Sequence, residues 1–128
     1  MRWEALHFAI KLGFPEPAVW RVRPRQVLYP LQARLRGSSD MSVFDQIFLF
    51  QEYSCLRDLK EPSLVLDLGA NVGFSTAYFL SAFPKARIVA VEPDERNLAI
   101  CKSNLSPYGD RVLLLHGEIG RASCRERV

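Results

Sequence analysis

Two acidic residues and a glycine-rich turn occupy positions where their side chains could bind a ligand. In the stretch SLVLDLGANVGFST, residues 63–76, an apolar run ends at Asp67 and the pattern acid-x-Gly-x-x-x-Gly follows. A second apolar run, ARIVAV, leads into Glu92, and Pro93 and Asp94 come next. If the two runs are neighbouring parallel strands, both acids lie at the carboxyl edge of the sheet, where such sheets bind their ligands.

The turn does not have the spacing of two common phosphate-binding motifs. A phosphate loop needs Gly-x-x-x-x-Gly-Lys-Ser/Thr, and counting from Gly69 places Phe74 at the second glycine. A dinucleotide fingerprint needs glycine at its first, third and sixth positions, where this chain has Gly69, Asn71 and Phe74. A strand-end carboxylate is a poor neighbour for pyrophosphate but a good one for ribose hydroxyls or a cationic ammonium or sulfonium. Glu92 could accept both ribose hydroxyls, so this combination favours S-adenosyl-L-methionine over a dinucleotide.

The elements that must position this turn alternate between strand and helix. Strands are expected at 64–68, 87–92 and 111–116, and helices at 73–82 and from the capping residue Asp94 to about Asn104. Short connections of this kind predict an α/β fold, with a parallel sheet ordered third, second, first strand and right-handed crossovers. The strands are nearly all apolar, which predicts that helices cover both faces of the sheet.

The first 62 residues have a different pattern and are expected to form a segment that precedes this core. Residues 3–12 have apolar residues at helical spacing, and proline-rich residues 14–37 suggest short strands of a hairpin or a sheet edge. The stretch SSDMSVFDQIFLFQEY predicts one helix, capped by Ser39 or Asp40, with Val43, Ile47 and Phe50 on one face.

Composition narrows the function classes. The chain has 128 residues, is 48% hydrophobic and 24% charged, and carries a formal charge of +3, as expected for a soluble globular domain. This charge is too small and too scattered to indicate nucleic acid binding, and the local cluster Arg21, Arg23 and Arg25 is expected on a solvated face. No apolar run approaches the roughly 20 residues of a spanning helix, and no signal peptide is recognised, so a cytoplasmic location is the default expectation.

The cysteines predict neither a disulfide framework nor a metal site. The three cysteines stand at positions 55, 101 and 124, which is not a metal-ligand spacing. Cys55 and Cys101 are expected to be small buried apolar side chains.

Several motifs in the same order extend these inferences to a known family. DLGANVGFST and VEPD resemble the first motif and the acidic ribose motif of class I S-adenosylmethionine-dependent methyltransferases. Together with SSDMSVFDQIFLFQEY and NLSPYGDRVLLLHG, they resemble the FkbM family over roughly residues 27–117. The resemblance implies a Rossmann-like three-layer sandwich and methyl transfer, usually to oxygen, with small-molecule or glycan hydroxyls as acceptors. Asn71 departs from the glycine common at that place, but asparagine tolerates positive backbone angles.

The resemblance also implies roles for individual residues. Those around the methionine portion would be Gly69, Ala70, Asn71 and Gly73, with Asp67 near the ammonium or the ribose; Glu92 would hold the ribose hydroxyls, and Pro93 and Asp94 would flank the adenine. Phe74 and Ser75 would open the helix that faces the cofactor, and Glu52 and Tyr53 would close the pocket. Neither a catalytic base nor an oligomeric state is indicated.

Two other functions remain open at this point. One is a non-enzymatic nucleoside-binding module, and the other is an oxidoreductase with a degenerate dinucleotide turn. Binding of S-adenosylhomocysteine without binding of NAD would separate the methyltransferase from the oxidoreductase.

The end of the chain has a different character. EIGRASCRERV has no apolar periodicity, and from about Ile119 it matches one reading frame of a common sequencing adapter. We therefore expect three parts: residues 1–62 before the core, a partial cofactor-binding core at 63–117, and a non-native tail at 118–128. The core would then be truncated after about three parallel strands, and the fragment would be inactive by itself.

Overall fold

The computed structural model describes residues 19–117. The strands are β1 (Val19–Val22), β2 (Leu31–Arg34), β3 (Leu64–Leu68), β4 (Arg87–Glu92) and β5 (Val112–His116). The α-helices are α2 (Asp40–Phe44), α3 (Phe74–Ala82) and α4 (Glu95–Leu105), and the shorter turns are η1 (Asp45–Leu49), η2 (Glu52–Leu56) and η3 (Ser106–Arg111). The helix expected at 3–12 and the tail at 118–128 lie outside the described residues.

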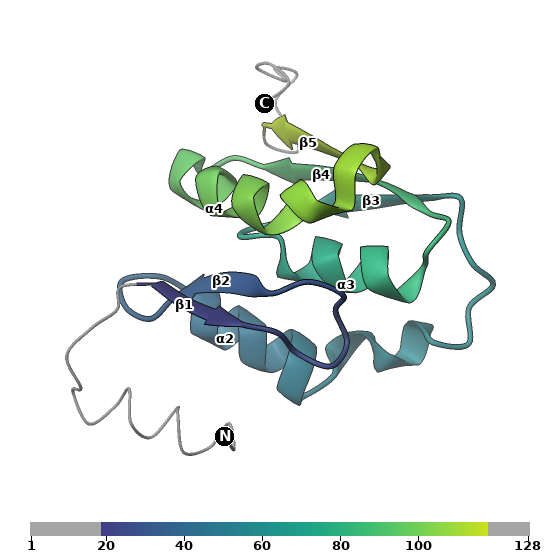
Figure 1. The fold of residues 1–128 in the computed structure, drawn as a ribbon, viewed down its shortest axis with the longest axis horizontal. Helices are drawn as coiled ribbons and strands as arrows, with labels where there is room; N and C mark the ends of the chain where they lie inside the picture. The colour runs from purple at the N-terminus through teal and green to yellow at the C-terminus, as the bar shows by residue number, and fades with distance from the viewer. Residues whose placement is uncertain (1–18, 118–128) are drawn as a thin grey trace.

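The core is a parallel sheet in the order β3-β4-β5, which confirms the predicted order and direction. Asp67 is in register with Ala90, and Glu92 with His116. Both crossovers run in the same direction across the sheet, so α3 and α4 pack side by side on one face. Figure 1 shows these two helices below the sheet, with the hairpin β1-β2 and α2 farther down.

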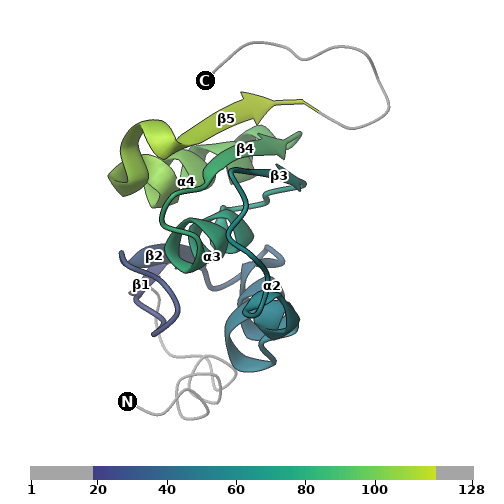
Figure 2. The ribbon, with the colours of Figure 1, turned by 90° about the vertical axis from the view of Figure 1, so that its right-hand side faces the viewer.

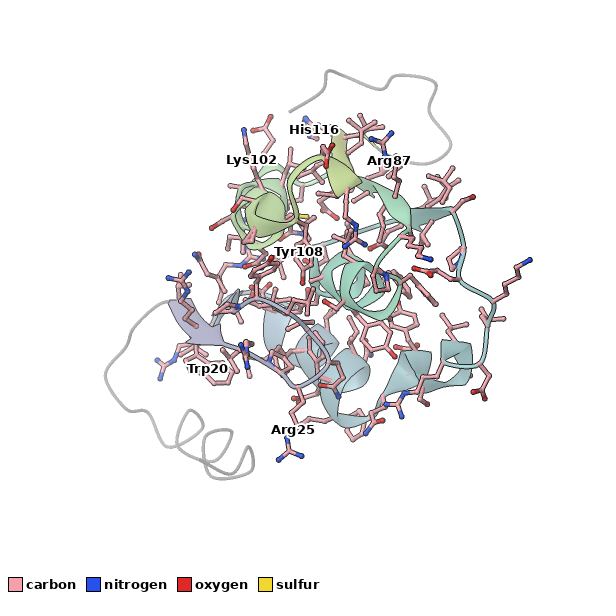
Figure 3. All side chains as sticks on the ribbon, turned by 45° about the vertical axis from the view of Figure 1, so that its right-hand side comes forward. Trp20, Arg25, Arg87, Lys102, Tyr108 and His116 are labelled. Atoms are coloured by element: carbon pink, nitrogen blue, oxygen red, sulfur yellow. The ribbon has the colours of Figure 1, made fainter. Side chains whose placement is uncertain are left out.

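The described residues therefore form three layers. In Figure 2 the sheet lies at the top, α3 and α4 come next, and the hairpin lies beside α2 at the bottom. The hairpin is antiparallel, pairing Val19 with Arg34 and Val22 with Leu31, which is one of the two arrangements suggested for residues 14–37. The arginines at positions 21, 23 and 25 are exposed, as expected, and Figure 3 shows Arg25 reaching away from the ribbon.

An aromatic cluster joins the lower layer to α3. Phe44 and Phe74 are fully buried, with ring centroids 5.5 Å apart and nearly perpendicular planes. Phe48 lies 4.6 Å from Phe44 and 6.1 Å from Phe74, measured between ring centroids. Because Phe74 is the first residue of α3, this cluster fixes the end of the helix that follows the glycine turn.

The helix predicted across residues 38–53 is interrupted, which corrects two expectations. Five residues of α-helix are followed by a π-helical turn and then, after Gln51 at φ 52°, by a 3-10 turn. The wider π turn shifts the buried face to Phe44, Ile47 and Phe48. Phe50, which was expected on the buried face with Val43 and Ile47, is instead 77% exposed. Ser39 stands at the N-cap position but makes no side-chain capping bond.

The expectation that Cys55 is buried is also wrong. It lies in the exposed 3-10 turn η2, whereas Cys101 of α4 is buried as predicted. The two cysteines therefore differ in exposure, because α4 packs against α3, whereas η2 lies at the periphery.

One face of the sheet is uncovered among the described residues, contrary to the expectation of helices on both faces. Leu64, Leu66 and Leu68 of β3 are 53%, 58% and 51% exposed. Leu66 is in register with Val89 of β4, and Val89 is in register with Leu113 of β5, which is 38% exposed. The apolar sequence of these strands is therefore matched by packing on only one side of the described sheet.

No helix among residues 19–117 is both long and apolar enough to cross a membrane.

Candidate functional site

The glycine turn, residues 69–73 between β3 and α3, is hydrogen-bonded to the end of β4. The backbone N–H groups of Gly69 and Ala70 both donate to the carbonyl oxygen of Val91, at 2.9 Å each. The Gly73 N–H donates to the Ala70 carbonyl at 2.8 Å, which closes the turn. Positive φ angles of 108°, 52° and 86° occur at Gly69, Asn71 and Gly73. Asn71 adopts the left-handed conformation that its residue type tolerates, so the departure from glycine is accommodated.

The two flanking glycines have different surroundings. A Cβ added at Gly73 would lie 3.1 Å from the sulfur of Cys101 and 3.1 Å from Leu105 Cγ, so this glycine lets α3 approach α4 closely. A Cβ added at Gly69 would meet no atom of residues 19–117 within 4 Å. The open space above Gly69 lies at the carboxyl edge of the sheet, where a ligand could approach the backbone.

Asp67 is held by two hydroxyl groups from the first turn of α3. Its Oδ2 accepts hydrogen bonds from Ser75 Oγ at 2.7 Å and from Thr76 Oγ1 at 2.5 Å. No donor among residues 19–117 contacts Oδ1, which leaves that oxygen for a ligand. Thr76 was not among the predicted site residues, although a hydroxyl at the start of a helix facing an acidic strand end could have indicated it.

Glu92 is buried, with 5% of its surface exposed, and hydrogen bonds to both carboxylate oxygens fix the orientation of its side chain. Oε2 accepts from the Asn71 backbone N–H at 2.8 Å. Oε1 accepts from the Asp94 backbone N–H at 3.0 Å and from Asn97 Nδ2 at 3.1 Å. Glu92 therefore contacts the glycine turn directly, and the sequence prediction that places these two features together is correct.

The charges of both strand-end acids act on one buried thiol. Burial, followed by the negative charges of Asp67 and Glu92, raises the pKa of Cys101 to about 12. Cys101 lies beneath the glycine turn, against Gly73. The two carboxylates are thus both within electrostatic reach of a single position below the turn.

Asn71 contributes a buried acceptor beside Glu92. Its Nδ2 donates to Ser39 Oγ at 3.2 Å, whereas its Oδ1 is buried without a donor among the described residues. Buried polar atoms of this kind usually have a partner, so Oδ1 is a candidate acceptor for a hydroxyl or ammonium group.

Asp94 is the N-cap of α4, as predicted, and Pro93 precedes it, directly after the end of β4. Asp94 caps α4: its side chain accepts from the backbone N–H groups of Arg96 at 2.8 Å and Asn97 at 3.3 Å. Its hydrogen bonds with Arg96 lower the pKa of Asp94 to about 2. Pro93 is exposed, and its carbonyl lies 2.9 Å from Nε2 of His116, at the end of β5.

The remaining predicted residues differ in position. Phe74 and Ser75 open α3, as expected, but the Phe74 ring is buried in the aromatic cluster. Tyr53 packs on Phe79 with ring centroids 4.8 Å apart, and burial, followed by the negative charge of Asp67, raises the Tyr53 pKa. Glu52 is exposed in η2, and no contact brings it to the glycine turn.

These residues fit S-adenosyl-L-methionine. The open space above Gly69 suits the methionine portion, the unpaired Asp67 Oδ1 suits a cation, and Glu92 and Asn71 Oδ1 offer acceptors for hydroxyl groups. No cluster of three or more metal-binding side chains occurs among residues 19–117.

Comparison with solved structures establishes the fold. A methyltransferase from Agrobacterium tumefaciens, described as S-adenosylmethionine-dependent, aligns with 80% of this chain and 34% of its own, with a TM-score of 0.60 and 15% identity. The chain has the class I methyltransferase fold. This match, together with the parallel strand order β3-β4-β5, confirms the predicted α/β architecture.

Sequence comparisons find related methyltransferases. The 2-O-methyltransferase NoeI of Sinorhizobium fredii is 34% identical over 104 residues, covering 75% of this chain and 40% of NoeI. Ribosomal RNA small subunit methyltransferase H of Sorangium cellulosum is 35% identical over 91 residues, covering 71% of this chain and 27% of that protein. The chain thus spans less than half the length of these relatives. No protein-family profile matches it.

Proposed function

We propose that this chain forms the cofactor-binding part of an S-adenosyl-L-methionine-dependent methyltransferase of the FkbM type, acting in the cytoplasm. One observation carries the proposal: Glu92 contacts the glycine turn, because the Asn71 backbone N–H donates a 2.8 Å hydrogen bond to Glu92 Oε2. A carboxylate at this turn, rather than a phosphate-binding backbone, supports a nucleoside without a phosphate group as the ligand.

The residues divide the binding task between the two strand ends. Asp67 presents Oδ1 to the ammonium group, because Ser75 and Thr76 hold its other oxygen. Glu92 accepts one ribose hydroxyl at its remaining acceptor position, and Asn71 Oδ1 accepts the other. The turn from Gly69 to Gly73 lets the methionine portion approach the backbone. Pro93 and Asp94 flank the adenine, and Tyr53 borders the site near Asp67.

When bound, the cofactor supplies an electrophilic methyl group on a sulfonium. The chain's own contribution is to fix that group so that an acceptor can attack in line, and such alignment accounts for much of the rate of a displacement. None of the described side chains is assigned as a catalytic base.

The proposed acceptor is a hydroxyl group of a small molecule or glycan. The similarity to NoeI, whose name describes 2-O-methylation, supports this choice and covers more of the chain than the similarity to the ribosomal RNA enzyme. The scattered charge of +3 also gives no support to an RNA acceptor.

Titration calorimetry on the protein expressed from the complete gene tests the proposal. We expect S-adenosylhomocysteine to bind and NAD not to bind. NAD binding in its place would support the oxidoreductase. Binding of S-adenosylhomocysteine without methyl transfer from labelled cofactor to glycans, small hydroxyl compounds or ribosomal RNA would support a nucleoside-binding module.

A further inference from the structure

Asn97 of α4 lies between the strand-end acid and an arginine of the amino-terminal hairpin. Its Nδ2 donates to Glu92 Oε1 at 3.1 Å, and its Oδ1 accepts from the Arg34 guanidinium at 2.6 Å. Arg34 is itself fixed by Asp40, through Nε to Oδ2 at 3.0 Å and a second bond to Oδ1 at 2.7 Å. Asp40 is fully buried, so this end of the chain of hydrogen bonds is rigidly anchored.

The network determines which way the Asn97 amide faces. A guanidinium can only donate hydrogen bonds, so the amide oxygen must face Arg34. The amide N–H₂ must then face Glu92, whose carboxylate can only accept. A flip of the amide would break both contacts, so Arg34 and Glu92 together hold Asn97 in one orientation.

The same contacts determine the orientation of Glu92. A carboxylate offers about four acceptor positions. Here Oε1 receives two donors and Oε2 receives one, from the Asn71 N–H. Asn97 is the side-chain donor in this set, and the other two donors are backbone groups. Removing it would leave the carboxylate held by the two backbone donors alone, one on each oxygen, and so less firmly oriented.

Two further links connect the amino-terminal segment with the glycine turn. Ser39 accepts from Asn71 Nδ2 at 3.2 Å. Asn104 bonds the backbone N–H and carbonyl of Gln32, at 2.7 and 3.0 Å, and also donates to the carbonyl of Val72 at 2.8 Å. Residues before the core are therefore attached to the turn at several independent points.

We propose that Asn97 is a positioning residue of the cofactor site. It holds the Glu92 carboxylate in the orientation that offers its remaining acceptor position to a ribose hydroxyl, and Arg34 sets the orientation of Asn97. The amino-terminal hairpin is thus part of the cofactor-binding machinery. This inference rests on the proposed function.

The experiment compares Asn97→Ala and Asn97→Asp with Lys102→Ala, in the protein expressed from the complete gene. Lys102 is an exposed residue of the same helix, and Figure 3 shows it pointing away from the body of the molecule. Binding of S-adenosylhomocysteine is measured by calorimetry between pH 5.5 and 8.5, and thermal unfolding is recorded for every variant.

We expect Asn97→Ala to weaken binding about tenfold at every pH, since one hydrogen bond to a charged group is lost. Asn97→Asp places a second carboxylate against Glu92 and should weaken binding about a hundredfold at pH 8.5. At pH 5.5 the two carboxyl groups can share a proton, which restores a donor to Glu92 and recovers about tenfold of the affinity.

Other charged groups lie near Glu92, and the comparison of the two variants separates them. They are Arg34 and Asp40 through Asn97, Asp94 and Arg96 at the start of α4, and His116 in register on β5. Arg34 contacts residue 97 directly and pairs with the new carboxyl group only in Asn97→Asp, whereas the other groups are the same in both variants. The difference between the two variants therefore reports the new carboxyl group together with its contact to Arg34.

Each outcome decides the inference. If the unaltered protein binds S-adenosylhomocysteine and both Asn97 variants bind as tightly as Lys102→Ala, the positioning role is wrong. Equal losses at every pH in the two variants, matched by equal losses of thermal stability, would indicate a structural role and overturn it as well. If Asn97→Ala does not fold, the nearly isosteric Asn97→Asp and its pH profile carry the test. Failure of the unaltered protein to bind overturns the proposed function and the inference with it.

Discussion

A Cβ atom at Gly73 would lie 3.1 Å from the sulfur of Cys101, so α3 begins in direct contact with α4. The same glycine has a φ of 86°, which a residue with a side chain adopts only with strain. Close helix approach and an unusual backbone angle thus coincide at the residue that ends the glycine turn.

We expect Gly73→Ala to lower the free energy of unfolding by about 2–4 kcal/mol, because backbone strain and overpacking add. Gly69→Ala is the matched control: it has a φ of 108° but no neighbour within 4 Å, so only strain of about 1–2 kcal/mol should apply. Urea unfolding measures both. Gly69→Ala should instead cost more affinity for S-adenosylhomocysteine, because its methyl group enters the open space. Equal stability losses in the two variants would contradict the packing argument.

Glu92→Ala should weaken binding of S-adenosylhomocysteine by about 2–3 kcal/mol, since a hydrogen bond from ribose to a carboxylate is lost and the Asn71 N–H loses its acceptor. Glu95→Ala, which removes an exposed carboxylate three residues along the chain, should leave the dissociation constant unchanged. Calorimetry on the protein expressed from the complete gene provides the comparison. An unchanged dissociation constant in Glu92→Ala would remove Glu92 from the site.

Asp67→Ala should also weaken binding of S-adenosylhomocysteine, and it leaves the Ser75 and Thr76 hydroxyls without their acceptor.

The raised pKa of Cys101 leads us to expect a loss of stability at alkaline pH. Its folded-state pKa is about 12, compared with an ordinary value of 9.0, chiefly because the thiol is buried. Between these two values the unfolded thiol ionises while the folded thiol remains protonated, so the unfolded state binds fewer protons and stability falls as pH rises. Urea unfolding at pH 8 and pH 10.5 should show a smaller alkaline loss in Cys101→Ala than in the unaltered chain.

Alkylation with iodoacetamide at pH 8, mapped by mass spectrometry, gives an independent check of Cys101. The exposed Cys55 should be modified in the folded protein, whereas Cys101 should be modified only after unfolding. Rapid modification of Cys101 in the folded protein would show that the thiol is accessible and that its burial is wrong.

The parts of the fold that follow local patterns could be predicted from the sequence. Asp67 and Glu92 follow apolar runs, and the short connections fix parallel neighbours, so their proximity required only the topology. The Asp94 cap also follows from residue type and position. Thr76 had a local signal that could have been used, since it lies in the first turn of α3.

Contacts between distant parts of the sequence could not be predicted in this way. Arg34 reaches Asn97 across 63 positions, and no periodicity relates the two residues. The π-helical turn is a second example: helical spacing placed Phe50 on the buried face, but the wider turn before it rotates that face away. These features depend on tertiary packing, which one sequence does not encode in any short pattern.

The uncovered sheet face leads to a last prediction, about association. Leu66 is 58% exposed at the middle of β3, and register places it beside Val89 and then Leu113, so the apolar surface continues across the strands. Surfaces of this kind promote association, and β3 is an edge of the described sheet. We expect the 128-residue chain, expressed alone, to associate at micromolar concentration in sedimentation velocity experiments and to show no cooperative thermal unfolding as a monomer. Leu66→Lys should shift the distribution toward monomer, whereas Leu59→Lys should not, although Leu59 is 57% exposed, because it lies outside the sheet. A soluble monomer that unfolds cooperatively and transfers methyl groups would show that this face needs no covering, and equal effects of the two lysine variants would show that charge alone controls the association.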